Sequence, residues 1–331
     1  MLIHPDKLPR PKLILSLVLL VHLVSLRASG IVVEYPVETD IPSLQFHQSF
    51  FSGINTIYIP FTLVGQLIVV EARVDTITGN FIMDTGAERL VLNQQYFGRE
   101  RHSSVASSGN TGPVSAASWT TVDSIGIERL SIMDLRAHLV DLHHIELKKN
   151  TRIIGILGYH VFSAFEIFID FQNHVIGLSM VDRDGQRVDR STTWESPADS
   201  VGFLLKNHLI VVNTVVNGTK FRMILDSGAE LNLLDRRVHR KVLDNFTILK
   251  RVNLTGVGRR EIEVLAGILT DLRCGDQHCP SMNTLITSMD EINENFGVSA
   301  HGVLGYEFLN TRRMLINYQK RKLYFFNPIR P

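Results

Sequence analysis

The sequence lacks several features that would point to a familiar class of protein. It has two cysteines in 331 residues, which excludes a disulfide-framework fold and leaves buried apolar surface as the source of stability. Its 34 basic and 33 acidic residues give a net charge of +1, so no positive field would gather nucleic acid. Neither a Gly-x-x-x-x-Gly-Lys nor a Gly-x-Ser-x-Gly pattern occurs, which argues against a phosphate-binding loop and a nucleophilic serine. The length and the 44% hydrophobic content are those of a globular protein with room for two domains.

Long hydrophobic runs are also absent, except for one near the N-terminus. Residues 13–26 (LILSLVLLVHLVSL) follow three basic residues and precede the small residues 28–30. This pattern is typical of an export signal, and the run is shorter than the ~20 residues that span a bilayer. We therefore expect residues 1–30 to be a signal peptide and the chain to be exported, to the periplasm or the extracellular space. An uncleaved segment that tethers the chain to a membrane is the alternative, and no other stable membrane contact is expected.

An internal repeat is the most informative feature that is present. Residues 68–84 and 210–226 align without a gap, and each predicts a strand, a turn and a second strand. The turn is expected at 217–218 in the second copy and around 78–80 in the first. Each second strand ends in an apolar triplet and then in the matching pentapeptides Asp84-Thr85-Gly86-Ala87-Glu88 and Asp226-Ser227-Gly228-Ala229-Glu230.

A second block, Gly-apolar-Leu-Gly-Tyr, recurs downstream at 155–159 and 302–306, and an apolar strand follows it in each copy. The Asp motifs are 142 positions apart and the Leu-Gly pairs 147, a difference that fits a surface loop. The organisation predicted is an N-terminal extension at 31–59, a first domain at 60–181, a linker at 182–200 and a second domain at 201–331. The extension matches neither copy and would add an edge strand or cover a groove.

Within each copy, short β-branched strand signals alternate with turn residues. The predicted fold class is therefore all-β. Short helices are expected just before or after the Leu-Gly blocks, for example at 158–164 and 288–296, and also at 234–243.

The duplicated Asp suggests two carboxylates that work together. One Asp-(Thr/Ser)-Gly is a weak signal, because it also suits a turn or a helix cap. Two copies in matching contexts are harder to explain in that way. If the copies pack about a pseudo-two-fold axis, Asp84 and Asp226 come within hydrogen-bond reach and hold one proton between them. One carboxyl is then a base that activates a water, and the other is an acid that protonates a carbonyl oxygen.

These residues resemble the retropepsin-type aspartic protease domain. The matching elements are the two Asp loops and the Leu-Gly blocks, over residues 60–326. The resemblance implies two retropepsin-like (acid protease) β-barrel domains, related by pseudo-two-fold symmetry and fused in one chain. It implies a catalytic dyad of Asp84 and Asp226, with Thr85 and Ser227 bracing the two loops. It also implies a peptide or protein substrate and neither a metal nor an organic cofactor.

The same resemblance implies a β-hairpin flap between each Asp loop and its Leu-Gly block. The candidates are Gly109 and Gly112 in the first copy and Gly256 and Gly258 in the second, where glycine would let a lid bend over a substrate. Ordinary glycine-rich turns are the alternative.

Two further residue pairs have open roles. Glu88 and Glu230, which follow the Asp motifs, would contact a substrate, face solvent or stabilise a turn. Cys274 and Cys279 flank His278, but a structural zinc needs four ligands and no second cluster is visible. A local disulfide is therefore expected between the two cysteines of an exported protein.

The sequence as a whole predicts an exported aspartic endopeptidase. A monomer is expected, because both Asp loops lie in one chain and the linker is long enough for the copies to dock. Two alternatives stay open. The chain would be a catalytically weak or inactive peptide-binding module with this fold, or each copy would pair with its counterpart on another chain.

Overall fold

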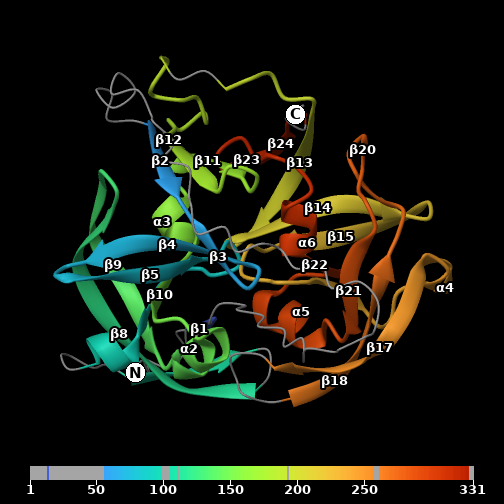
Figure 1. The fold of residues 1–331 in the computed structure, drawn as a ribbon, viewed down its shortest axis with the longest axis horizontal. Coiled ribbons are helices and arrows are strands. Elements are labelled where there is room, and N and C mark those ends of the chain that lie inside the picture. The colour runs from blue at the N-terminus through green and yellow to red at the C-terminus, as the bar shows by residue number, and fades with distance from the viewer. Residues whose placement is uncertain are drawn as a thin grey trace, which may run out of the picture.

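The structure, a computed structural model, describes residues 13–14, 56–98, 104–109, 112–191, 194–255 and 261–327. They form two β-rich lobes, one from each repeat, with a sheet shared between them (Figure 1). The predicted signal peptide, apart from residues 13–14, and the extension up to residue 55 lie outside the described residues. Within the part of the chain that is described, no helix is long and apolar enough to cross a membrane.

The N-terminal lobe is a closed barrel. Its sheet has the order β1-β7-β8-β9-β6-β10-β5-β4-β3, and a further pairing of β8 with β4 closes the barrel. The strands are β1 (Leu13–Ile14), β3 (Thr62–Val64), β4 (Leu67–Val74), β5 (Ile77–Met83), β6 (Leu90–Asn93), β7 (Ser104–Gly109), β8 (Gly112–Ile127), β9 (Leu130–Val140) and β10 (Ile153–Leu157). Closure leaves few exposed strand edges and encloses an apolar interior.

The C-terminal lobe repeats this arrangement with one break. Its strands are β14 (Leu209–Val216), β15 (Thr219–Leu225), β16 (Asn232–Asp235), β17 (Phe246–Thr255), β18 (Glu261–Leu269), β19 (Leu272–Cys274), β20 (Gln277–His278), β21 (Met282–Thr287) and β22 (Gly302–Leu304). The long strand β8 of the first lobe corresponds to two strands here, β18 and β19. Of these, β19 pairs with β14 as β8 pairs with β4.

The two lobes share a six-stranded antiparallel sheet in the order β13-β24-β23-β11-β12-β2. Its strands are β2 (Thr56–Pro60), β11 (Phe165–Asp170), β12 (Val175–Met180), β13 (Asp199–Lys206), β23 (Met314–Asn317) and β24 (Lys322–Phe325). At its centre Ile167 pairs with Ile316 and Ile169 with Met314. With the 147-residue offset of the repeats, this register maps onto itself when the copies are exchanged. The sheet therefore has the self-complementary pairing of a two-fold dimer interface, built within one chain.

The helices are few and short. They are α1 (Gln94–Phe97), α2 (His143–Lys149), α3 (Tyr159–Phe162), α4 (Arg240–Leu243), α5 (Asp290–Phe296) and α6 (Tyr306–Leu309). Helices α3, α4 and α5 lie within the three segments where helices are expected. The fold is all-β with few short helices, as the sequence predicts.

Two local predictions need correction. The turn of the first repeat lies at Asp75 and Thr76, between β4 and β5, and residues 78–80 belong to β5. Asp75 has φ 51°, a left-handed conformation that Asp tolerates, and its repeat equivalent is Asn217 with φ 46°. Residues 232–235 form strand β16, so only the end of the segment 234–243 is helical.

The segment expected to be a linker packs against the shared sheet. The Trp194 indole stacks on Phe168, with ring centroids 4.8 Å apart, and donates to Glu166 Oε1 at 2.8 Å. Arg187 also pairs with Glu166, at 3.0 Å. Strand β13 starts at Asp199, inside the predicted linker, and β2 starts at Thr56, inside the predicted extension, where it forms an edge strand of the shared sheet.

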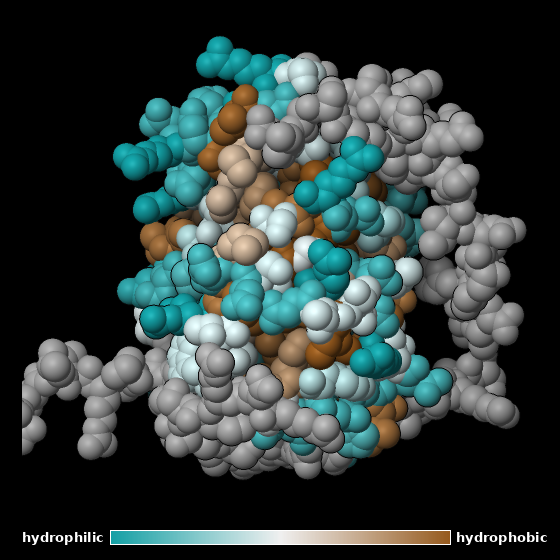
Figure 2. Space-filling view, turned by 90° about the vertical axis from the view of Figure 1, so that its left-hand side faces the viewer, coloured by the Kyte–Doolittle hydropathy of each residue, from teal (hydrophilic) through white to brown (hydrophobic). Residues whose placement is uncertain are grey.

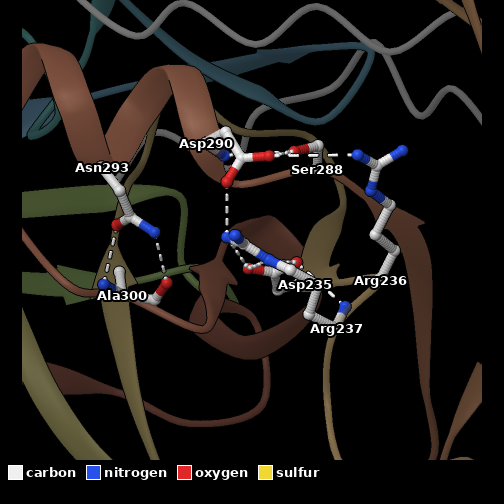
Figure 3. A network of polar contacts seen from close by, with 7 residues as sticks. All are labelled: Asp235, Arg236, Arg237, Ser288, Asp290, Asn293 and Ala300. Atoms are coloured by element: carbon white, nitrogen blue, oxygen red, sulfur yellow. Dashed lines mark hydrogen bonds and ion pairs between the residues drawn. The ribbon is translucent and has the colours of Figure 1, made fainter.

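Polar contacts fix the helix that follows β21 in the second lobe. Arg237 bridges Asp235, at the end of β16, and Asp290, at the start of α5, at 2.9 and 2.6 Å (Figure 3). Ser288 donates to Asp290, and Asn293 exchanges two hydrogen bonds with Ala300. These contacts hold α5 at the end of the lobe that carries the second Leu-Gly block.

The outer surface is mixed in character. Seen from the side of the N-terminal lobe, apolar residues show between hydrophilic ones (Figure 2). Large exposed apolar side chains in the described part of the chain include Met133, Leu147 and Ile248, and they come from different elements of the fold.

Candidate active site

The two Asp loops leave the ends of strands β5 and β15 and are held by the Leu-Gly blocks. The backbone N–H of Asp84 donates to the Leu157 carbonyl at 3.0 Å, and that of Asp226 donates to the Leu304 carbonyl at 3.0 Å. Strands β10 and β22 thus run parallel to β5 and β15 up to the two aspartates. The two repeated motifs of each copy are adjacent in space.

Close packing requires glycine after the leucine of each Leu-Gly pair, at Gly158 and Gly305. A Cβ at Gly158 would lie 2.4 Å from the Arg89 carbonyl oxygen, and one at Gly305 would lie 2.3 Å from that of Ala229. Heavy atoms do not approach so closely, so any side chain there would push the Asp loop away. The glycine therefore sets the distance between the loop and its supporting strand.

The carboxylates of Asp84 and Asp226 face one another across the boundary between the lobes. A Cβ at Gly86 would lie 2.7 Å from the Asp226 carboxylate carbon, and one at Gly228 would lie 2.5 Å from that of Asp84. Each carboxylate is thus packed against the glycine of the opposite loop. Both aspartates are fully buried.

Backbone N–H groups orient the inner oxygen of each carboxylate. Asp84 Oδ1 accepts from Gly86 N at 2.8 Å and from Ala87 N at 3.0 Å. Asp226 Oδ1 accepts from Gly228 N at 2.8 Å. The outer Oδ2 atoms of both residues are buried and have no hydrogen-bond partner in the described structure. They are therefore free to hold a shared proton or a water.

Burial dominates the ionisation of this pair. It raises the pKa of Asp84 well above its usual range, with a further increase from the negative charge of Asp226. Burial also raises the pKa of Asp226, to about 6. Two acids this close share a proton and ionise as a unit, so loss of the first proton leaves one acid and one base.

Thr85 and Ser227 connect the loops through four hydrogen bonds across the lobe boundary. Thr85 N donates to Ser227 Oγ, and Ser227 N donates to Thr85 Oγ1, both at 3.0 Å. Each hydroxyl in turn donates to the backbone of the opposite strand, Thr85 to Leu225 O at 3.3 Å and Ser227 to Met83 O at 2.9 Å. Every hydroxyl and N–H in this group is used, which fixes the two aspartates relative to one another.

Glu88 and Glu230 differ in environment although they are equivalent in the repeat. Glu230 is buried and accepts from Gln66 N at 3.0 Å, and it forms an ion pair with Lys149 of the other lobe. Glu88 is partly exposed and lies 3.2 Å from Arg89 and 3.6 Å from His160. Contact with His160 is the main cause that lowers the pKa of Glu88. Glu230 is therefore a tie between the lobes, and Glu88 is a residue at the margin of the site.

The flap candidates fall on hairpins where the chain is described. Gly109 and Gly112 pair with each other at the end of the hairpin formed by β7 and β8. In the second lobe β17 and β18 form the corresponding hairpin, paired up to Thr255 and Glu261. Gly256 and Gly258 lie outside the described residues, between these strands.

The expected disulfide is not formed. Cys274 and Cys279 are free thiols on the β19–β20 hairpin, where Cys274 pairs with Gln277, and Cys279 N donates to Leu272 O. The cysteines are therefore diagonal neighbours, for which a Cα separation of about 7–8 Å is typical, and that is too long for an unstrained disulfide. Among the described residues, no group of three or more potential metal ligands was found.

Two residues that tie the lobes together were missed by the sequence reasoning. His208 and Gln66 occupy equivalent turns before β14 and β4, 142 positions apart, and each reaches toward the Asp loop of the opposite lobe. The repeat alignment contained that signal, because both positions directly precede an aligned strand.

A comparison with family models matches one segment of the second lobe. Residues 212–308, which include the second Asp loop and its Leu-Gly block, match the family model described as aspartyl protease. A search of curated proteins found no match. Among solved structures the chain is similar to a retropepsin-like aspartic protease from Rickettsia conorii, with 20% identity over 38% of this chain and 90% of that one, and a TM-score of 0.27. The strands and loops of the matched segment recur in the first lobe, so the chain resembles a tandem of two domains of this kind.

Proposed function

We propose that this chain is an exported aspartic endopeptidase that hydrolyses peptide bonds with Asp84, Asp226 and a water held between them. The observation that carries the proposal is the pair of fully buried carboxylates, each packed against the glycine of the opposite loop. Burial of ionised carboxylates costs free energy, so two buried carboxylates that face each other indicate a shared function.

The chemistry follows from one proton shared by two acids. The ionised carboxylate takes a proton from the water as the water oxygen attacks the carbonyl carbon of the substrate. The protonated carboxyl gives its proton to the carbonyl oxygen, which forms a neutral tetrahedral gem-diol. In the collapse of this intermediate, the C–N bond breaks, the amine nitrogen receives a proton, and one carboxyl is again protonated. No external oxidant, reductant or metal is needed for this balance.

An extended peptide or protein segment is the substrate class that suits this arrangement. The β7–β8 and β17–β18 hairpins would cover it, with Gly109, Gly112, Gly256 and Gly258 as the bending points. We propose a monomer, because the loops of both lobes are already joined by the Thr85 and Ser227 hydrogen bonds within one chain. The near-neutral charge gives no support for nucleic acid as a partner.

The proposal of export rests on the sequence of residues 1–30. Its test is N-terminal sequencing of the protein recovered outside the cytoplasm, where a start near Ile31 is expected. Retention of residues 1–30 in a membrane fraction would instead support the tethered form.

Catalysis is tested by Asp84→Asn and Asp226→Asn in a cleavage assay on denatured protein, from acid to neutral pH. Each variant is expected to lose about 10³-fold or more of the activity, because the one remaining carboxyl cannot be base and acid at the same time. Asp123→Asn, at an exposed site on β8, is the matched control and should cleave as the wild type does. Full activity in either dyad variant would exclude the proposed mechanism.

Two other outcomes have distinct meanings. If the wild type binds peptides but cleaves none at any pH, the chain is a peptide-binding module with this fold. If activity falls with dilution while the mass in solution changes from dimer to monomer, each lobe pairs with a second chain.

A further inference from the structure

We propose that His208, a residue of the C-terminal lobe, is a positioning residue for the Asp84 carboxylate in the N-terminal lobe. The inference rests on the proposed function and adds a residue to its machinery. The contact that carries it is a hydrogen bond of 3.0 Å between His208 Nε2 and the carbonyl oxygen of Gly86.

The Gly86 carbonyl belongs to a peptide unit that serves the dyad directly. The same unit carries the N–H of Ala87, which donates to Asp84 Oδ1 at 3.0 Å. His208 therefore begins a chain of hydrogen bonds that passes through one peptide group and ends on the carboxylate. Bonds in such a chain polarise one another, so the donor on the imidazole strengthens the donor that meets Asp84.

The surroundings of His208 fix the form of its ring. A carbonyl oxygen accepts only, so Nε2 must carry a hydrogen. Nδ1 is buried and has no hydrogen-bond partner in the described structure, and the ring packs edge-on against Phe296 at 5.5 Å. Burial is the largest effect on the pKa of His208 and lowers it. Burial thus favours the neutral imidazole, and the contact with Gly86 places a hydrogen on Nε2 in either form.

Three charged or titratable side chains face this ring, all from the N-terminal lobe: Glu88, Arg89 and His160. Glu88 favours a charged imidazole, whereas Arg89 and His160 oppose it. Their effects on the ring are secondary to burial. The hydrogen bond to Gly86 raises the pKa of His208 against the effect of burial, and Nε2–H can donate in either charge state of the ring.

The equivalent turn of the other lobe makes different contacts from those of His208. Gln66, at the position that matches His208, uses its backbone N–H on Glu230 and its side chain on Glu307, at 3.0 and 3.2 Å. Ala87 N donates to Asp84 Oδ1 at 3.0 Å, whereas the equivalent Ala229 N donates to the backbone carbonyl of Asp226 at 3.3 Å. The pseudo-two-fold site is thus asymmetric at this peptide unit, which is the one that His208 contacts.

The test compares His208→Leu with His208→Gln, on a peptide that the wild-type chain cleaves. Loss of the donor should weaken the Ala87 N–H on Asp84, so the ionised dyad is less stable and the acidic limb of the kcat/KM profile moves up by roughly 0.3–0.5 pH unit. We expect kcat to fall about 5–10-fold, with KM within about twofold. The Gln amide reaches the same carbonyl as a donor and should restore both values.

Gln66→Leu is the matched control, because it removes a side-chain hydrogen bond between the lobes that does not involve a dyad peptide. This variant should leave the acidic limb of the kcat/KM profile at the same pH as in the wild type. An unchanged limb in His208→Leu, or an equal shift in Gln66→Leu, would overturn the inference.

A second measurement needs no variant that might misfold. Nitrogen-15 NMR of the wild type should show hydrogen on Nε2 of His208 throughout the pH range in which the wild type cleaves peptide. Hydrogen on Nδ1 alone would overturn the inference. A wild type that cleaves nothing would contradict the proposed function, whereas active wild type with no effect of His208→Leu would contradict only the role of His208.

Discussion

Thr85 and Ser227 exchange reciprocal hydrogen bonds, in which the backbone N–H of each residue donates to the hydroxyl of the other at 3.0 Å. Both residues are buried and come from different lobes. The hydroxyl in the loop of each repeat therefore accepts a hydrogen bond from a backbone N–H in the loop of the other repeat. Neither loop has all of its buried polar groups satisfied unless the lobes are docked.

Thr85→Val is expected to weaken this connection. The variant keeps the shape of the side chain but leaves Ser227 N–H and the Leu225 carbonyl without their buried partner. The free energy of unfolding should fall by about 2–4 kcal/mol, with a loss of activity, in urea unfolding and cleavage assays. Thr85→Ser keeps the hydroxyl and should stay within about 1 kcal/mol of the wild type. Equal losses in both variants would show that the methyl group, and not the hydrogen bonding, is decisive.

Lys149→Met tests the buried ion pair that ties the lobes together. Glu230 and Lys149 have side-chain exposures of only 6% and 13%, so removal of the lysine leaves a carboxylate with no compensating charge. We expect a loss of about 3–5 kcal/mol in the free energy of unfolding at neutral pH. The double variant Lys149→Met with Glu230→Gln removes both charges and should regain most of this loss.

Glu88→Gln is the control for the ion pair, at the equivalent position of the first repeat. Glu88 is partly exposed and meets Arg89 and His160 near the surface, where such pairs contribute little. The substitution should lower the free energy of unfolding by less than about 1 kcal/mol. A cost at this position similar to that of Lys149→Met would mean that the two glutamates have equivalent roles.

The sequence was sufficient for the parts of the site that are repeated, because each Asp loop and Leu-Gly block is local and occurs twice. It also indicated β11 and β23 of the shared sheet, the apolar strands that follow the Leu-Gly blocks. Of the contacts between the lobes, the resemblance indicated those of Thr85 and Ser227. Those of Lys149, Glu230 and His208 were not predictable, since they depend on how the lobes dock. The Gly79 segment was misassigned because a glycine within a strand resembles a turn.

The cysteines show how spacing alone misleads. Cys274 and Cys279 are close in the sequence and share one face of a hairpin, but the register of the hairpin places them diagonally across from each other.

We expect two free thiols on alkylation of the denatured protein, counted by mass spectrometry. In the native protein, burial raises the pKa of Cys274 to about 12 and that of Cys279 to about 11. Alkylation at pH 8 should therefore be slow, because few thiolates are present. A mass two hydrogens lower, with no alkylation, would show a disulfide.

The raised pKa values of the dyad predict how stability depends on pH. A carboxyl with a higher pKa in the folded state than in the unfolded state binds more protons when folded. Its contribution to the free energy of unfolding therefore decreases as pH rises from the pKa of the unfolded state, 3.8, through the pKa of the folded state, about 6 for Asp226.

The side chain of the Asp226→Asn variant cannot ionise, and its Oδ1 can still accept from Gly228 N. The variant should match the wild type in stability near pH 4 and exceed it by roughly 1–3 kcal/mol at pH 7. Urea unfolding of the two proteins at several pH values measures this difference, with Asp123→Asn as the exposed control. A constant difference between pH 4 and 7 would mean that Asp226 is not an acid stabilised by burial, and a variant that loses stability at pH 7 would mean that its charge supports the fold.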